Sequence, residues 1–239
     1  MDRRQFNSVS ASTLANIGLT GLIGLAHQHA LALSLSDLTN ADASAGLKLA
    51  LEKGALSAIG LLGQTDGFLG NPKVRIPLPG FLEKAAGFLR TIGQGSKIDE
   101  LTISMNRAAE AAIPQAKELL VSAVKSMSVG DAKKILGGGE TSVTDFFAEK
   151  TRSPLEGRFL PVVTQATEKV GLAAQYNDVA GKAASMGLMK AEDANIQKYV
   201  TTKSLDGLYL MIGEEEKKIR QDPLGTGSNL LKKVFGALK

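Results

Sequence analysis

Cysteine and tryptophan are absent from the sequence, and histidine occurs only at His27 and His29. Histidine and cysteine supply the commonest general base, the usual ligands of transition metals and the thiol nucleophile. Their lack argues against zinc, copper, haem and iron–sulfur sites. Oxygen ligands remain, but no stretch alternates acidic residues around a central glycine as an EF-hand does. We therefore expect no metal and no other cofactor, and the sequence alone assigns no catalytic residue.

Other features are scarce as well. Without cysteine no disulfide can form, so stability depends on the burial of apolar side chains. Aromatic residues make up 5% of the chain, and the apolar set is mainly aliphatic, which favours closely packed helices. The formal net charge of +4 is small, and the sequence lacks basic clusters interleaved with aromatic residues, which are typical of nucleic-acid-binding proteins. We expect no nucleic-acid partner.

The first part of the chain, residues 1–32, has the pattern of an export leader. Arg3-Arg4 gives it a positive start, and a mildly apolar stretch follows from Thr13 to Ala26. Ala30-Leu31-Ala32 supplies the small residues that a signal peptidase reads. The apolar stretch is too short to cross a bilayer as a helix, so we expect no transmembrane segment. We predict a signal peptide over 1–32, cut after Ala32, which contains both histidines, and a bacterial periplasmic location for residues 33–239.

The export route stays open between two alternatives. The paired arginines followed by Phe6 favour the twin-arginine route, which exports folded proteins. Asp2 stands where serine or threonine is usual, and Asn7 and Ser8 replace the usual leucine and lysine. The general secretory route therefore remains the other interpretation.

Helical periodicity runs through most of residues 33–239, since apolar residues recur at spacings of three and four. This predicts one all-α domain of about eight helices, some of them long and kinked. The exception is the stretch NPKVRIPLP at 71–79, named here the proline-rich segment, whose prolines forbid a helix interior and predict a short extended stretch. The longest helix is expected from Lys97 to Met127, with a kink at Pro114.

The start and stop signals divide the remaining helices. Ser128 with Asp131 resembles a capping box, and Ser153-Pro154-Leu155-Glu156 combines a cap, a proline at the first helical position and a glutamate at the third, which predicts a new helix there. The helices expected besides the longest one cover residues 42–62, 80–91, 128–137, 142 onward, 153–170 with a bend at Pro161, 172–186, 191–220 and 228–239.

Two polar sets form the candidate binding site. Asn106, Arg107 and Glu110 lie beside the apolar stripe of the longest expected helix, and Arg107 and Glu110 can pair because they are three residues apart. Arg220 and Asp222 lie where the last long helix stops. If the two sets meet, they form a network between the C-terminal arm and the central helix. Such a network either fixes the packing or binds a ligand, and both interpretations stay open.

Other polar clusters have simpler interpretations. Gly137-Gly138-Gly139 lacks the lysine of a nucleotide loop and is interpreted as a helix stop. The run Glu214-Glu215-Glu216 precedes Lys217-Lys218 and is interpreted as a solvated helix face. A hydrolase without histidine needs two carboxylates about 5–10 Å apart. Nothing in the sequence pairs any two of the candidates Glu110, Asp145, Glu156, Asp206 and Asp222.

Six segments together resemble an exported bacterial family catalogued as domain of unknown function 4197 (DUF4197). They are NPKVRIPLP at 71–79, MNRAAE at 105–110, DAKKIL at 131–136, GLY at 207–209, and IRQDP followed by LLKKVFG at 219–223 and 230–236. The resemblance covers essentially all of residues 33–239. It implies a helical, exported bacterial protein, and it implies no activity and no catalytic residues.

We favour a non-catalytic binding or interaction protein of the periplasm or cell envelope, whose partner is an envelope protein or a small ligand. It would present a groove or an apolar patch, with the unpaired backbone groups of the proline-rich segment as one place for it. One alternative is a carboxylate-dependent hydrolase of envelope glycans, so enzymatic activity stays open although we lean against it. The other is a lipid-binding protein that contacts the membrane surface through residues 228–239, where Lys232, Lys233 and Lys239 lie beside an apolar face.

Overall fold

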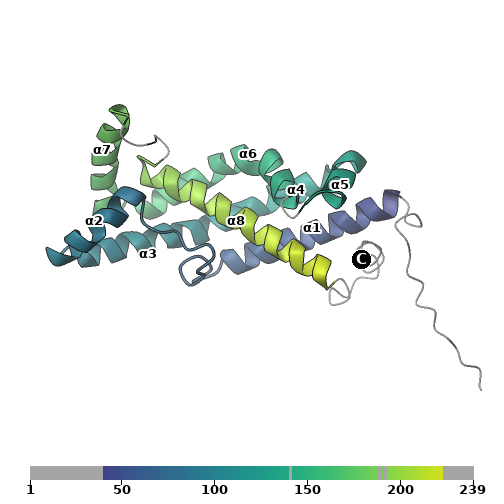
Figure 1. Ribbon diagram of the computed structural model, residues 1–239, viewed down its shortest axis with the longest axis horizontal. Coiled ribbons are helices and arrows are strands. Elements are labelled where there is room, and N and C mark those ends of the chain that lie inside the picture. Colours follow the sequence, from purple (N-terminus) through teal and green to yellow (C-terminus); the bar gives the residue numbers. More distant parts are fainter. Residues whose placement is uncertain (1–39, 140–141, 188–189, 191–192, 223–239) are drawn as a thin grey trace, which may run out of the picture. The chain divides into compact units, whose positions relative to one another are not determined.

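The computed structural model describes residues 40–139, 142–187, 190 and 193–222, without the side chains of residues 40–42 and 220. All of these residues belong to one compact unit. The predicted signal peptide and the helix predicted over 228–239 lie outside the described residues. Helices connected by short loops make up the described part, and no strand occurs within it (Figure 1). The helices are α1 (Asn40–Leu62), α2 (Gly80–Thr91), α3 (Gly95–Ala112), the 3₁₀ turn η2 (Ile113–Ala116), α4 (Lys117–Lys125), α5 (Val129–Leu136), α6 (Ser142–Thr167), α7 (Gly171–Ser185) and α8 (Ile196–Gln221).

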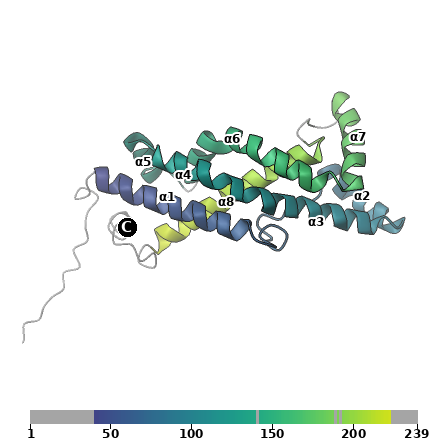
Figure 2. The same ribbon diagram turned by 180° about the vertical axis from the view of Figure 1, so that it is seen from behind.

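The prediction of an all-α fold is confirmed. The helices α6 and α8 pack along each other, α3 packs against both, and α1 contacts α8, α4 and α5 (Figures 1 and 2). One core runs through these contacts and is built mainly from aliphatic residues and alanine. Its largest fully buried side chains include Phe68, Leu62, Phe147, Phe159 and Tyr209.

Pro114 separates two helices where the sequence predicts one kinked helix. Because proline lacks the N–H and its ring collides with the preceding turn, Pro114 disrupts the α-helical bonds here. Residues 113–116 form η2 instead, and α3 and α4 follow on either side. The 3₁₀ turn is packed into the core, since Ile113 and Ala116 are both fully buried. The two longest helices are therefore α6 and α8, with 26 residues each.

The predicted helix start at Ser153–Glu156 is wrong. Pro154 and Pro161 both lie inside α6, which continues from Ser142 to Thr167. A stripe of side chains at every fourth position stays buried across the expected boundary: Phe147, Thr151, Leu155, Phe159 and Val163. A proline inside a helix costs about 3 kcal/mol, whereas each large apolar side chain contributes about 1.5–3 kcal/mol when buried. Packing of the whole stripe therefore outweighs the local start signal.

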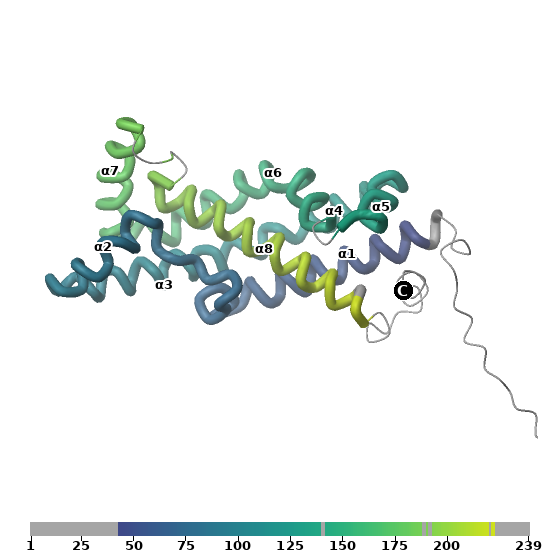
Figure 3. Tube along the Cα trace, viewed as in Figure 1, coloured from purple at the N-terminus to yellow at the C-terminus, as the bar shows by residue number. Residues whose placement is uncertain are grey.

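Capping residues determine where α5 and α8 begin. Ser128 and Asp131 form the predicted capping box at the start of α5. The last long helix begins at Ile196 rather than 191, because the side chain of Asn195 accepts the Lys198 N–H at 3.0 Å and caps it there. The proline-rich segment begins with a turn at 72–74, and only residues 75–79 leave regular structure altogether on the way from α1 to α2 (Figure 3).

Candidate functional site

Asn106, the first residue of the predicted site, anchors the proline-rich segment to α3. Its side chain is fully buried. Its Oδ1 accepts the Ile76 N–H at 2.8 Å, and its Nδ2 donates to the Ile76 carbonyl at 3.0 Å and to the Thr102 carbonyl at 2.9 Å. Each polar atom of this amide is thus used within the chain. Asn106 therefore acts as a structural link and presents no group to a ligand.

Arg107 and Glu110 form the predicted ion pair, with 2.7 Å between Nη1 and Oε2. The other oxygen of Glu110 accepts the backbone N–H groups of Phe68 and Leu69 at 3.0 and 3.1 Å. Arg107 also pairs with Asp66 at 2.8 Å, and the bonds to Glu110 and then Asp66 raise the pKa of Arg107. The three charges hold the loop after α1 against α3.

Among the described side chains, the expected connection to the C-terminal arm does not appear. The side chain of Arg220 is outside the described residues, and Asp222 lies exposed where α8 ends. The interactions of Arg107 and Glu110 go to one another and to residues 66–69. The structure thus brings three of the five predicted residues, Asn106, Arg107 and Glu110, together at the loop after α1 and leaves Asp222 out of their contacts.

Several backbone groups of the proline-rich segment, which the sequence suggests are unpaired, have partners within the chain. The N–H groups of Val74 and Arg75 bind the Asn71 carbonyl. Asn106 binds both backbone groups of Ile76, and the prolines have no N–H to give. These groups are therefore not available to a partner strand.

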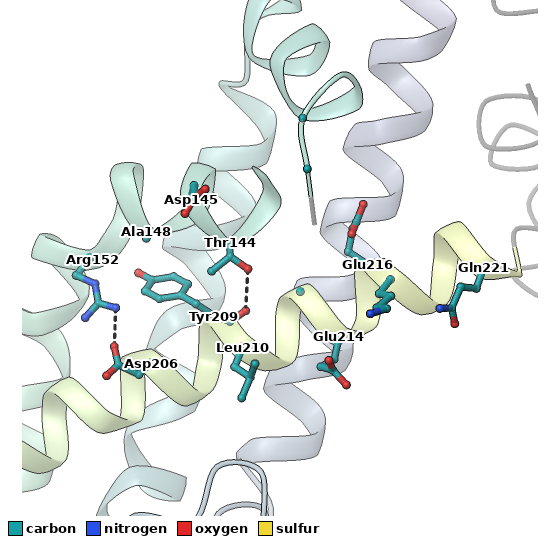
Figure 4. Close-up of a pocket in the computed structure, with 14 residues that line it drawn as sticks. Thr144, Asp145, Ala148, Arg152, Asp206, Tyr209, Leu210, Glu214, Glu216 and Gln221 are labelled. Carbon is teal, nitrogen blue, oxygen red and sulfur yellow. Dashed lines mark hydrogen bonds and ion pairs between the residues drawn. The ribbon is translucent and has the colours of Figure 1, made fainter. Parts of the chain in front are cut away.

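A groove between α6 and α8 has a volume of about 800 Å³ (Figure 4). It is open to solvent, and its walls come from the loop after α5, the first half of α6 and the second half of α8. The residues that line it are Gly138, Gly139, Thr144, Asp145, Ala148, Arg152, Asp206, Tyr209, Leu210, Gly213, Glu214, Glu216, Lys217 and Gln221. We name it the α6–α8 groove.

Tyr209 and Arg152 fix one end of the α6–α8 groove. Tyr209 is 2% exposed, and its hydroxyl lies 2.9 Å from the Thr151 hydroxyl. Burial raises the pKa of Tyr209, although the hydrogen bond to Thr151 opposes the shift. The guanidinium of Arg152 lies over the tyrosine ring, 5.3 Å from its centroid. Arg152 also pairs with Asp206 at 2.7 Å, so α6 and α8 are tied together across the groove (Figure 4).

Gly213 lets the two helices approach each other in the middle of the groove. A Cβ at this position would lie 2.9 Å from the Thr144 hydroxyl oxygen, which is closer than such atoms pack. The same hydroxyl donates to the Tyr209 carbonyl at 3.4 Å. A glycine at 213 therefore sets the width of the groove.

The lining of the α6–α8 groove carries more negative than positive charge, since four carboxylates face two cations. Glu214 forms an ion pair with Lys73, and this contact lowers the pKa of Glu214. Glu216 is only 3% exposed. Within the described residues no group of three or more acidic or histidine side chains is arranged to hold a metal ion.

Two of the five hydrolase candidates, Asp145 and Asp206, lie in the α6–α8 groove. Glu110 is held in its ion pair on α3, and neither Glu156 nor Asp222 is among the lining residues. Sequence reasoning missed the rest of the groove: it interpreted the glycine run at 137–139 as a helix stop and the glutamate run at 214–216 as a solvated face. Arg152 and Asp206 are 54 positions apart, so no spacing within one helix could reveal their pairing.

These features define an all-α protein with an acidic groove between two long helices. The chain belongs to the family described as "Protein of unknown function (DUF4197)", whose model matches residues 37–236. The resemblance noted in the sequence is thereby confirmed. No curated protein and no solved structure matches the chain. Among the helices of the described residues, none is both long and apolar enough to span a membrane.

Proposed function

We propose that this chain is a non-catalytic binding protein of the bacterial periplasm or cell envelope, and that the α6–α8 groove is its binding site. The observation that carries the proposal is an open recess of about 800 Å³ lined by both charged and apolar side chains. Sites that bind small molecules or peptide segments have volumes of about 300–1,000 Å³ and combine apolar walls with a few polar groups. The residues that the sequence singles out on α3 support the loop after α1 instead.

The chemistry of the groove selects for a ligand with positive charge. Asp145 lines the groove from α6, so a cationic group in the groove would meet this carboxylate. Leu210 is 44% exposed and adds an apolar contact. A basic segment of an envelope protein or a small organic cation has this combination. Its binding should weaken as the salt concentration rises, because the attraction is between partly exposed charges.

Export remains part of the proposal. Cleavage after Ala32 would release residues 33–239 into the periplasm, where an envelope partner is accessible. N-terminal sequencing of the protein from a periplasmic fraction tests this: a new N-terminus at Leu33 supports export, and an intact leader in a cytoplasmic fraction contradicts it.

Binding to the groove is tested by comparing the full chain with two variants. Leu210→Arg places a bulky cation in the groove, and Leu61→Arg is the matched control on α1, where the leucine is 40% exposed and lines no part of the groove. Each immobilised protein is incubated with envelope extract, and recovered proteins and small molecules are quantified by mass spectrometry. We expect Leu210→Arg to recover about tenfold less of the specific partner, equivalent to a loss of about 1.4 kcal/mol. Equal recovery by all three proteins, or no enriched partner, would contradict the proposal.

A hydrolase acting on envelope glycans is the second candidate, since Asp145 and Asp206 share the groove. General acid and base catalysis needs one carboxyl protonated and the other ionised, but Asp206 is paired with Arg152. Incubation of the full chain and of the Asp145→Asn variant with cell-wall glycans decides the matter. Release of reducing ends that depends on Asp145 would favour the hydrolase over the binding protein.

A further inference from the structure

A second recess, with a volume of about 290 Å³, lies between the proline-rich segment and α8. We name it the α8 recess. Residues 73–77 line one side of it, and α8 contributes Tyr199, Lys203, Asp206, Gly207 and Leu210. Sites for drug-sized ligands have volumes of about 300–1,000 Å³. The α8 recess therefore suits a ligand at the small end of that range.

The backbone that borders the α8 recess is anchored from two helices. Asn106 on α3 binds both backbone groups of Ile76, and the Tyr199 hydroxyl on α8 donates to the Pro77 carbonyl at 3.2 Å. Gly207 lets the segment lie directly against α8 (Figure 3), because a Cβ at this position would come within 3.3 Å of it. The segment is thus held in one position although it forms no helix.

Two cations without an anionic partner line the α8 recess. Arg75 is exposed next to the anchored Ile76, and its guanidinium has no hydrogen-bond or ion-pair partner among the residues that the structure describes. Lys203 contributes an ammonium group from α8, 5.8 Å from the centroid of the Tyr199 ring. Within the described part, no carboxylate pairs with this lysine. Both positive charges therefore remain available to a ligand.

The other charged groups of the α8 recess already have partners. Asp206 pairs with Arg152 at 2.7 Å, and Lys73 forms an ion pair with Glu214. Each pair is neutral as a whole, so neither changes the net charge of the recess. The two unpaired cations give the recess its positive charge, and that charge favours an anionic ligand.

The kinds of cation present favour a phosphate group over a carboxylate. The planar fork of an arginine binds two oxygens of one anion, and a lysine binds phosphate as a point charge. A phosphate monoester carries about −1.5 to −2 charges at pH 7, which matches two cations, whereas a carboxylate carries a single charge. Pro77 and Leu210 add apolar surface for the organic part of the ligand.

We propose that the α8 recess binds the phosphate group of a small phosphate monoester, held by Arg75 and Lys203. This goes beyond the function proposed above, because it adds a second ligand of opposite charge at a different set of residues. The same chemical group occurs in soluble phosphate esters and in the headgroup of phosphatidic acid. The experiment below distinguishes these two sources.

Isothermal titration calorimetry of the full chain with inorganic phosphate and with glycerol 3-phosphate tests the site. We expect one saturable site per chain. Arg75→Gln and Lys203→Gln should each weaken binding by about tenfold or more, because each removes a charged hydrogen-bond donor. The matched controls are Arg158→Gln on α6 and Lys84→Gln on α2, which are exposed and lie outside the recess. Both controls should bind as the unmodified chain does.

A conservative variant separates the arginine fork from its charge. Arg75→Lys should bind phosphate more tightly than Arg75→Gln but less tightly than the unmodified chain, because lysine keeps the charge and loses the fork. Circular dichroism of each variant verifies that the helices are retained. Arg75 and Lys203 are both exposed, so their replacement should leave the fold intact.

Flotation with phosphatidylcholine vesicles, with and without phosphatidic acid, identifies the source of the phosphate. Flotation that requires phosphatidic acid and is reduced in Arg75→Gln assigns the site to a lipid headgroup. Binding of glycerol 3-phosphate without such flotation assigns it to a soluble ester. Both outcomes support a phosphate site.

Three results would overturn the proposal. The chain could show no saturable binding of either phosphate probe and no flotation that depends on phosphatidic acid. Arg75→Gln and Lys203→Gln could bind phosphate as tightly as the two controls. Glycerate, which carries a carboxylate, could bind as tightly as glycerol 3-phosphate, and the assignment to phosphate would then be wrong.

Discussion

Replacement of Asn106 by alanine should destabilise the protein strongly, although the residue touches no proposed ligand. The change removes the partners of the Ile76 N–H and carbonyl, and Ile76 is only 1% exposed. A buried backbone group without a partner costs about 1–3 kcal/mol, so we expect a loss of about 3 kcal/mol in the free energy of unfolding. The melting temperature should fall by about 6–12 °C, given about 2–4 °C per kcal/mol for a domain of this size.

Urea unfolding followed by circular dichroism at 222 nm measures this loss, and hydrogen exchange at the Ile76 amide locates it. The control is Asn177→Ala, because Asn177 also bridges two segments through its amide but is only partly buried. Water can replace its partners, so a loss of about 1 kcal/mol is expected there. If Asn106→Ala loses no more than the control and the Ile76 amide stays protected, the assigned anchoring role is refuted.

Three further predictions concern stability. Burial raises the pKa of Tyr199 from 10.0 to about 12. Between these two pH values the phenol stays protonated in the folded protein but ionises in the unfolded one. Stability should be complete below pH 10 and decline as the pH rises toward 12, and tyrosinate absorbance at 295 nm should appear only with unfolding; ionisation near pH 10 in the folded state would contradict this. Gly207→Ala should cost about 1–3 kcal/mol, because the new Cβ would lie 2.8 Å from the Phe68 ring, whereas Gly181→Ala, with open space around it, should be neutral or stabilising in thermal unfolding. Ser128→Ala removes the capping box of α5 and should lower the unfolding free energy by about 1 kcal/mol; a melting temperature equal to that of the parent chain would count against the cap.

The fold was predictable where local signals and burial agree. The apolar periodicity predicts α1, α2 and α3, and Ser128 with Asp131 predicts the start of α5. Prediction failed at Pro154, where a strong local start signal conflicts with a stripe buried by distant helices. A sequence read one helix at a time does not show which neighbours bury that stripe.

The sequence likewise indicated only those parts of the candidate site that depend on local spacing. The pair Arg107–Glu110 lies within one helix, so its spacing is visible in the sequence. Its function depends on Asp66 and the loop after α1, which only the fold brings near. The α6–α8 groove forms where the faces of two helices meet, and no spacing within one helix predicts that meeting. Its Arg152–Asp206 pair joins helices that are far apart in the chain.

Hydrogen–deuterium exchange of the full chain with and without its recovered envelope partner tests the central claim most directly. The groove account predicts that the partner slows exchange in residues 144–152 of α6 and 206–217 of α8, and leaves α2 unchanged. Slower exchange confined to α2 or to the loop after α1, with the two groove segments unaffected, would contradict it.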